Sequence, residues 1–315
     1  MLQSKKLPVI FLLGPTASGK TDWAIEWQKQ FGRIEIISVD SVMVYQGCDI
    51  GSAKPTAEIL KKHPHHLVNF TTLDETFSVA NFCIEALQCI EGIHQRNNIP
   101  LLVGGSMMYF NLLKNGITSL PSADSHLRET LENRIKSEGL NSLYTELSTL
   151  DALVASKIMP QDTQRIIRAL ELIYLASSVE LTDTEDSSSD PLSNKYNLHE
   201  YGIFPKDRAL LHKRIEVRQR ELIAGGLLEE VKGLQAEYQL SPDHPAMKAV
   251  NYRQALQVIN KELEANDLFE RSLYATRQLA KRQCTWLRGW ENLHAFDIDE
   301  FNQATKHLKN AVNFA

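Results

Sequence analysis

Glycines, a lysine and a threonine near the start of the chain have the spacing of a phosphate-binding loop. The glycines let the backbone curl so that its N–H groups point at an anion, and the helix N-terminus that follows adds a positive dipole. The lysine supplies a full charge to phosphate oxygens, and the threonine hydroxyl can ligate Mg²⁺. We therefore expect a diphosphate- or triphosphate-binding site with Mg²⁺ as its cofactor. The pattern G-x-x-x-x-G-K-[ST] is filled by Gly14, Pro15, Thr16, Ala17, Ser18, Gly19, Lys20 and Thr21.

A second group that could do chemistry is Asp40, which with Ser41 directly follows the β-branched run of residues 34–39. Because ligands bind at the carboxyl ends of the strands in open α/β sheets, we expect Asp40 beside the phosphate loop. There it could hold magnesium through water or accept a proton from a nucleophile, and it could equally cap a helix N-terminus. The loop leaves the reaction open as well, since ATPases, GTPases and small-molecule kinases share it.

The elements that must position these groups alternate between strands and helices. Buried strands are predicted at residues 9–13, 34–39 and 99–105, where short apolar runs end in glycine or in Asp40. Helical spacing follows the first strand, and a helix is predicted over residues 79–95. This alternation predicts an α/β fold, a parallel sheet core flanked by helices on both faces.

The pattern changes after the third strand, and we divide the chain into three segments. Residues 1–117 form the first part of the phosphate-loop core, and residues 118–160 an inserted all-helical subdomain with Asp124 as a helix N-cap. Residues 161–315 return to the core. They include an acidic, serine-rich linker at 181–197 and basic helices at the C-terminus.

The composition is that of a globular protein, with 43% of the 315 residues hydrophobic and 23% charged. The net charge of −5, from 34 basic and 39 acidic residues, excludes a uniformly basic nucleic-acid coat and argues mildly against an RNA or DNA partner. Residues 271–288 are a local exception, with five basic residues, no acidic ones and two aromatic rings, Tyr274 and Trp286, that could stack on bases. An amphipathic helix with one solvated basic side would have the same composition.

Cysteine and histidine patterns indicate neither a disulfide nor a metal site. The four cysteines have no CxxC spacing, which is typical of reduced thiols in a cytosolic protein. His63, His65 and His66 lack a further ligand motif, so we assign them to the surface or to loop packing. No stretch approaches the roughly 20 apolar residues that a membrane helix needs, and we expect a cytoplasmic protein without membrane contact.

Four motifs follow the phosphate loop in order across nearly the whole chain. They are ISVDSVMVYQGCDIGSAKP at residues 37–55, LLVGGSMMYF at 101–110, QRIIRALE at 164–171 and ATRQLAKRQCTWLR at 275–288. Together with the loop, these motifs resemble those of the tRNA dimethylallyltransferase (isopentenyl-transferase) family. The resemblance implies a P-loop NTPase-like core. It also implies transfer of a dimethylallyl group from dimethylallyl diphosphate to N6 of the adenosine 3′-adjacent to the anticodon. The partners would then be tRNA and dimethylallyl diphosphate, and the protein a monomer.

The same resemblance implies roles for individual residues. Asp40 is the general base for the amine, Ser106 positions the amine or the carboxylate, and Lys20 with the phosphate loop stabilises the leaving diphosphate. An arginine of residues 212–218 closes over the diphosphate. We favour Arg218, but Arg214 lies one helical turn away and the choice between them is open.

Three residues depart from the family pattern, in which Met43 is commonly Gln, Ser106 is Thr and Asn251 is Gly. Ser106 keeps the hydroxyl, Met43 cannot make an amide hydrogen bond to a base, and Asn251 tolerates a left-handed backbone. Contacts with tRNA are implied for Asp40, Ser41, Val42, Met43, Ser106, Arg128, Gln164, Arg165, Ile166, Ile167, Arg168, Lys248, Asn251, Tyr252, Arg253, Lys281, Arg282, Gln283, Trp286 and Arg288.

Two other classes of protein share part of these features. A small-molecule kinase of the nucleotide-kinase type would have the phosphate loop and a strand-end aspartate, but it would not need the basic residues 271–288. A non-catalytic, nucleotide-regulated RNA-binding adaptor would keep the basic residues without needing Asp40 and Ser106 next to the loop. The order and extent of the motifs favour the transferase.

Overall fold

The computed structural model describes residues 6–116, 124–178 and 190–314. The chain divides into two compact units, which we describe one at a time. The core unit takes in the residues up to 116 and those from 190 onward, and the helical unit the residues between them. Within the described ranges, no helix has both the length and the apolar character needed to cross a membrane.

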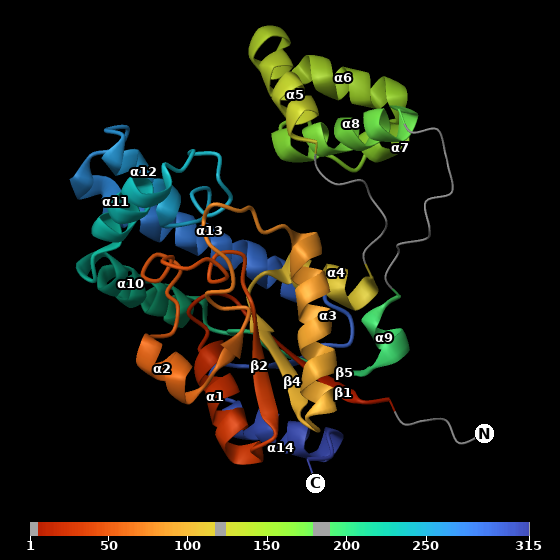
Figure 1. Ribbon diagram of the computed structural model, residues 1–315, viewed down its shortest axis with the longest axis vertical. Helices are drawn as coiled ribbons and strands as arrows, with labels where there is room; N and C mark the ends of the chain where they lie inside the picture. The colour runs from red at the N-terminus through yellow and green to blue at the C-terminus, as the bar shows by residue number, and fades with distance from the viewer. Residues whose placement is uncertain (1–5, 117–123, 179–189, 315) are drawn as a thin grey trace. The chain divides into compact units, whose positions relative to one another are not determined.

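A parallel sheet forms the centre of the core unit (Figure 1). Its order is β3-β2-β4-β1-β5-β6, so β1 lies between β4 and β5, and β4 lies between β1 and β2. The carboxyl ends of β1, β2 and β4 therefore lie side by side, as the predicted α/β fold requires. The strands are β1 (Pro8–Leu13), β2 (Ile34–Val39), β3 (His65–His66), β4 (Ile99–Gly104), β5 (Asn197–Ile203) and β6 (His294–Phe296).

Helices cover both faces of this sheet because alternate strand residues point in opposite directions. Ile10 and Leu12 of β1 belong to a cluster with Trp23 and Trp27 of α1 (Lys20–Phe31). The same cluster includes buried residues of α14 (Phe301–Ala311). Phe11 points the other way, with its ring 5.0 Å from that of Phe110 in α4 (Met107–Asn115). The expected three-layer core is confirmed.

The remaining helices of the core unit include α2 (Ala57–Lys62), α3 (Val79–Gln95) and α9 (Leu192–Lys195). The bounds of α3 are those predicted from the sequence. Helices α10 (Arg208–Ala224), α11 (Leu227–Tyr238), α12 (Tyr252–Ile259) and α13 (Leu268–Arg288) contact one another and lie together in Figure 1. Residues of α10, α12 and α13 line the cavity described below, opposite the ends of the strands.

The helical unit contains α5 (Ser125–Glu138), α6 (Leu140–Leu150), α7 (Ala152–Ala155) and α8 (Thr163–Ser178). Asp124 caps α5 as predicted, accepting a hydrogen bond from the N–H of Leu127 at 2.9 Å. Leu131 and Leu147 pack with Ile166 and Leu170 of α8 in one apolar cluster. The boundary expected at residue 160 is therefore wrong, because α8 completes the core of this unit instead of returning to the sheet.

The acidic linker expected at residues 181–197 is also shorter than predicted at its C-terminal end. Residues 179–189 lie outside the described part of the chain. Leu192–Lys195 form α9, with Leu192 only 1% exposed, and β5 begins at Asn197. The acidic composition ends at Asp190, so the following residues can pack against the core.

Candidate active site

The phosphate loop connects β1 to α1 through two residues in the left-handed backbone region, Ala17 at φ 62° and Gly19 at φ 92°. Ser18 between them is fully buried, and its hydroxyl has no hydrogen-bond partner within the described ranges. A Cβ on Gly14 would lie 2.8 Å from the Ser18 hydroxyl oxygen and 3.1 Å from the Lys20 side chain. The close turn at Gly14 thus requires glycine, and the loop has the shape of an anion-binding nest at a helix N-terminus.

Lys20 is held over this loop without a carboxylate hydrogen bond. Its ammonium donates to the carbonyl oxygen of Pro15 at 2.7 Å. The pKa of Lys20 is lowered to about 7, first by burial and then by the nearby Arg218 guanidinium, against an opposing effect of Asp40. An anionic ligand in the loop would raise the pKa of Lys20 again, because its negative charge favours the protonated ammonium beside the Arg218 guanidinium.

Asp40 follows β2 and has one carboxylate oxygen in use. Its Oδ1 accepts hydrogen bonds from the N–H groups of Val42 and Met43, at 2.8 and 3.1 Å. Within the described ranges, Oδ2 receives no hydrogen bond. Capping and chemistry were alternatives for this residue from the sequence, and the geometry allows both, with one oxygen capping the turn and the other free to act.

Ser106 occupies the N-cap position of α4, immediately after β4, and its side chain makes no capping hydrogen bond. The hydroxyl is therefore available to a ligand. In the sheet, β4 lies between β1 and β2. Ser106, which follows β4, is therefore placed between the phosphate loop after β1 and Asp40 after β2.

The structure distinguishes the two arginines of α10. Arg218 is largely buried and lines the same cavity as Lys20. Burial lowers the pKa of Arg218, although Asp40 and Asp22 oppose the shift. Arg214 is exposed and lines a second depression, which Ala17, Gly19 and Arg218 also line. Both arginines therefore lie beside the phosphate loop, and Arg218 is the one that shares the cavity with Lys20.

A cavity of about 400 Å³ lies between the strand ends and the helices α10, α12 and α13. Polar groups gather at the loop, and apolar side chains such as Ile215, Leu222 and Leu279 line the helical wall. This combination suits a ligand with an anionic end and an apolar part. The predicted site residues that line the cavity are Thr16, Ala17, Lys20, Thr21, Asp40, Ser41, Val42, Met43, Ser106, Arg218, Lys248, Asn251, Tyr252, Arg282 and Gln283.

A sequence profile of the IPP transferase family matches residues 43–290. The chain belongs to this family. It is 43% identical, over 288 residues, to a curated tRNA dimethylallyltransferase of Nitrosomonas eutropha, with 91% of this chain and 90% of that protein aligned.

Solved structures of IPP transferases have the same fold. The tRNA isopentenylpyrophosphate transferase of Bacillus halodurans is 32% identical, with a TM-score of 0.68 over 98% of this chain and 95% of that one. The enzyme of Staphylococcus epidermidis is 29% identical, again with a TM-score of 0.68, over 98% of this chain and 100% of that one. The suspected family and the P-loop-like α/β fold are confirmed.

Helix α13 presents several of the basic residues for which the family resemblance implies RNA contacts. Lys281, Arg282 and Arg288 are exposed, and Trp286 is 42% exposed. Arg277 instead pairs with Glu216 of α10 at 3.4 Å, so it contributes less to the basic surface. Arg253, on α12, is exposed as well.

Two residues expected to contact tRNA have structural roles in their side chains. Tyr252 is fully buried, and its hydroxyl donates to Glu230 at 2.7 Å. The Gln283 carboxamide accepts from the N–H of Thr16 and donates to the carbonyl oxygen of Gly105, both at 2.9 Å. The polar groups of these two side chains thus hold the cavity wall together, and their contact with tRNA stays a prediction.

The predicted contacts in the helical unit divide in the same way. Arg128 and Arg168 both bind the buried carboxylate of Glu171, and Gln164 and Arg165 are exposed. Ile166 and Ile167 are 0% and 7% exposed and pack in the apolar cluster of the unit, and their contact with tRNA stays a prediction.

Sequence reasoning missed two residues at the site. His65 lines the cavity from β3, with Nδ1 2.6 Å from the carbonyl oxygen of His63 and with Nε2 buried and without a partner in the described part of the chain. Its assignment to the surface or to loop packing is incomplete. Glu230 of α11 binds the loop that follows Asp40. A glutamate on an amphipathic helix has no local signal for such a role.

Proposed function

We propose that the chain transfers a dimethylallyl group from dimethylallyl diphosphate to N6 of the adenosine 3′-adjacent to the anticodon in tRNA. The products are N6-(dimethylallyl)adenosine and diphosphate. The observation that carries the proposal is one cavity in which a phosphate loop, a strand-end carboxylate and an apolar wall meet. Family membership and the tRNA-acting relative support it.

In the reaction, the C1–O bond of the donor breaks and its electron pair leaves with the diphosphate. The lone pair of N6 forms the new bond to C1, and one N6 proton is lost. Lys20, Arg218 and the loop N–H groups stabilise the negative charge that develops on the diphosphate. Because hydrogen bonds to the carbonyl oxygens of Pro15 and Ala53 already orient Lys20 and Arg218, little reorganisation is needed at the moment of reaction.

Asp40 is the group that takes the N6 proton. Its free oxygen is available for the amine while Oδ1 remains tied to the backbone of Val42 and Met43. The exocyclic amine of a purine is a weak nucleophile, so removal of its proton as the C–N bond forms lowers the barrier. The Ser106 hydroxyl orients the amine or the carboxylate from the neighbouring strand end.

The residues at the loop fit Mg²⁺. Thr21 offers a hydroxyl oxygen next to Lys20 in the cavity. Magnesium prefers such oxygen ligands together with water and substrate phosphates, and no cluster of three or more metal-binding side chains occurs in the described ranges. When bound, the ion would neutralise part of the charge on the diphosphate.

A direct test is to incubate the purified protein with Mg²⁺, labelled dimethylallyl diphosphate and unmodified tRNA, with labelled ATP in a parallel tube. Label in tRNA, located at N6 of the adenosine after the anticodon, is the expected result. Phosphate transfer from ATP without labelling of tRNA would favour the small-molecule kinase. We propose further that the protein is a monomer acting in the cytoplasm; light scattering of the purified protein checks the first point.

A further inference from the structure

The loop of residues 48–54 forms part of the cavity wall and binds Arg218. Gly51, Ser52 and Ala53 line the cavity. The Arg218 guanidinium donates a hydrogen bond from Nη2 to the carbonyl oxygen of Ala53 at 3.0 Å. Within the described ranges, the guanidinium makes no other hydrogen bond. The position of Arg218 over the phosphate loop therefore depends on the position of one backbone carbonyl.

Ala53 holds that carbonyl in an unfavourable backbone conformation. Its φ is 53°, in the left-handed region where an alanine Cβ crowds the backbone. Such a residue stays in place only when its surroundings over-determine it. Within the loop, the N–H of Ala53 donates to the carbonyl oxygen of Ile50 at 2.8 Å, and the N–H of Lys54 to that of Asp49 at 2.9 Å.

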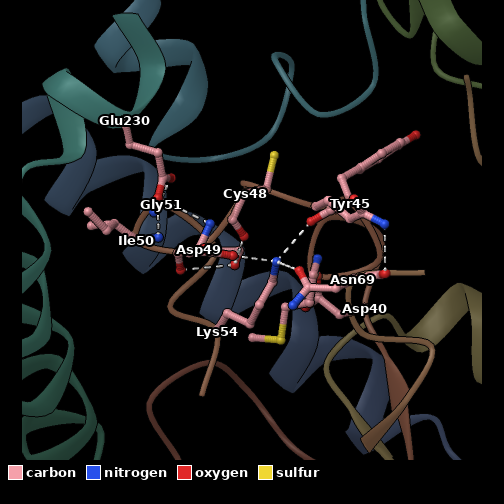
Figure 2. A network of polar contacts seen from close by, with 12 residues as sticks. Asp40, Tyr45, Cys48, Asp49, Ile50, Gly51, Lys54, Asn69 and Glu230 are labelled. Atoms are coloured by element: carbon pink, nitrogen blue, oxygen red, sulfur yellow. Dashed lines mark hydrogen bonds and ion pairs between the residues drawn. The ribbon is translucent and has the colours of Figure 1, made fainter. Parts of the chain in front are cut away.

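Glu230, from α11, supplies the strongest outside support. Its carboxylate accepts hydrogen bonds from three consecutive N–H groups, those of Asp49, Ile50 and Gly51, at 3.1, 2.5 and 3.0 Å (Figure 2). It also accepts from the Tyr252 hydroxyl at 2.7 Å. Charge-assisted bonds of this kind fix a turn more firmly than neutral ones.

Lys54 closes the other end of the loop. Its side chain is 2% exposed, and its ammonium donates to the carbonyl oxygen of Tyr45 at 2.8 Å and to side-chain oxygens of Asp49 and Asn69 at 2.6 Å each (Figure 2). Glu230 holds the loop before Ala53, and the buried Lys54 side chain holds it directly after Ala53. These contacts on both sides keep Ala53 in the left-handed conformation.

We propose that Glu230 is a positioning residue for diphosphate binding: by holding the 48–54 loop, it presents the Ala53 carbonyl that orients Arg218. The inference rests on the proposed function, since it assumes that Arg218 binds the donor diphosphate. Glu230 itself binds the loop backbone and Tyr252, and it acts only through Arg218.

The test measures binding of inorganic diphosphate with Mg²⁺ by calorimetry for the wild type and for Glu230→Gln. Glutamine keeps the size of the side chain but loses its charge and one acceptor. We expect the Kd to rise about tenfold, the effect of losing well-oriented hydrogen bonds to a charged group. The matched control is Glu229→Gln, an exposed glutamate next along α11, which should change the Kd by less than twofold.

Two further variants separate positioning from general destabilisation. In an Arg218→Ala background, Glu230→Gln should have almost no additional effect on diphosphate binding, because the group it positions is gone. Ala53→Gly in the Glu230→Gln protein should recover part of the affinity, because glycine adopts the left-handed turn without strain. The affinity for tRNA should stay within twofold of the wild type in Glu230→Gln.

Equal losses of diphosphate affinity with and without Arg218 would overturn the inference, as would an unchanged Kd in a folded Glu230→Gln protein. If Glu230→Gln does not fold, Glu230→Asp keeps the charge but shortens the side chain and should raise the Kd two- to fivefold, since the carboxylate no longer reaches all three N–H groups of the loop; an unchanged value would again overturn it. Failure of the wild type to prenylate tRNA while these diphosphate effects hold would contradict the proposed function and not this inference.

Discussion

At the scale of single residues, the site depends on groups that have one polar atom engaged and another left available. Asp40 uses Oδ1 for the backbone, and its Oδ2 receives no hydrogen bond in the described ranges. The Ser106 hydroxyl has no capping partner. Both residues line the cavity, so these atoms are available to a bound substrate.

Replacement of Asp40 by alanine should lower kcat by about 10² to 10⁴ while leaving tRNA affinity nearly unchanged, because a general base acts on the proton transfer and adds little to binding. Single-turnover transfer of label to tRNA and a filter-binding titration measure the two quantities. Asp74→Ala, an exposed aspartate outside the cavity, is the control and should behave as the wild type. Near-normal turnover of the Asp40 variant at saturating substrates would remove the residue from the role of base.

The lowered pKa of Lys20 predicts that diphosphate binding takes up a proton. In the free protein Lys20 loses its proton around pH 7, since burial and Arg218 disfavour the charge. A bound diphosphate favours the ammonium and raises its pKa, so binding should draw in up to one proton between about pH 7 and 9 and weaken as the pH rises through that range. Calorimetry in two buffers of different ionisation enthalpy gives the proton count. In Lys20→Met the uptake should disappear.

At the scale of elements, distant segments hold the phosphate loop and its neighbours in place. The Gln283 carboxamide connects α13 to the loop through Thr16 and to the end of β4 through Gly105. A Cβ on Gly105 would lie 2.4 Å from the Gln283 nitrogen, so the close approach depends on glycine. The helix that carries the basic surface is thereby fixed to the phosphate loop.

Gln283→Ala should weaken diphosphate binding about tenfold, because the N–H of Thr16 loses its acceptor and the loop gains freedom. Gln283→Glu keeps that acceptor but brings a carboxylate oxygen against the Gly105 carbonyl and a negative charge beside the phosphate loop, so it should weaken diphosphate binding more than the alanine variant. Gln303→Ala, on the exposed side of α14, is the control. Equal affinity in all four proteins, measured by calorimetry, would show that α13 does not position the loop.

In the helical unit, Glu171 joins α5 to α8. The carboxylate is 0% exposed and binds Arg128, Arg168 and the N–H of Asp124. Burial alone would raise the pKa of Glu171, but these hydrogen bonds hold it below its usual value. The contribution to stability is therefore present above the unfolded pKa near 4.3 and is lost as the pH falls through the lower, folded value.

Thermal unfolding followed at several pH values between 2 and 7 tests this behaviour. The Tm of the helical unit should fall on acidification in the wild type. In Glu171→Gln it should already be lower at pH 7, by the equivalent of about 2 kcal/mol, and should depend less on pH. Glu129→Gln, an exposed glutamate of α5, should follow the wild type. Parallel pH profiles for Glu171→Gln and the wild type would contradict the assignment.

Local patterns predicted what depends on local chain geometry, and contacts between distant residues set the rest. The loop, Asp40 and Ser106 could be placed from the sequence because parallel strands bring their carboxyl ends to one edge. Gln283 and Thr16 are 267 positions apart, and nothing in either neighbourhood indicates the other. Strands of two or three residues such as β3 and β6 show no periodicity to detect. The apolar face of α8 packs with Leu131 and Leu147, and no local pattern indicates that α8 belongs to the helical unit.

At the scale of the whole molecule, the net charge of −5 is the sum of opposed regions. The linker residues from 181 to Asp190 are rich in acidic side chains. Helix α13, in contrast, presents Lys281, Arg282 and Arg288 to solvent beside the exposed ring of Trp286. The mild argument against an RNA partner from the average charge is therefore outweighed by the local distribution. The pairing of Arg277 with Glu216 shows that the effective positive charge is smaller than the count of basic residues suggests.

The affinity for tRNA should fall with rising salt, because each phosphate contact releases counterions. In a plot of log Kd against log salt concentration, Lys281→Ala with Arg282→Ala should reduce the slope by about 0.7–0.9 for each contact that is lost. The control removes the same charge elsewhere, as Lys306→Ala with Lys309→Ala on the exposed side of α14. We expect a reduced slope only in the α13 variant, because RNA whose adenine reaches Asp40 must lie at the mouth of the cavity. An equal reduction of the slope in both double variants would mean that tRNA responds to the overall charge and not to the surface of α13.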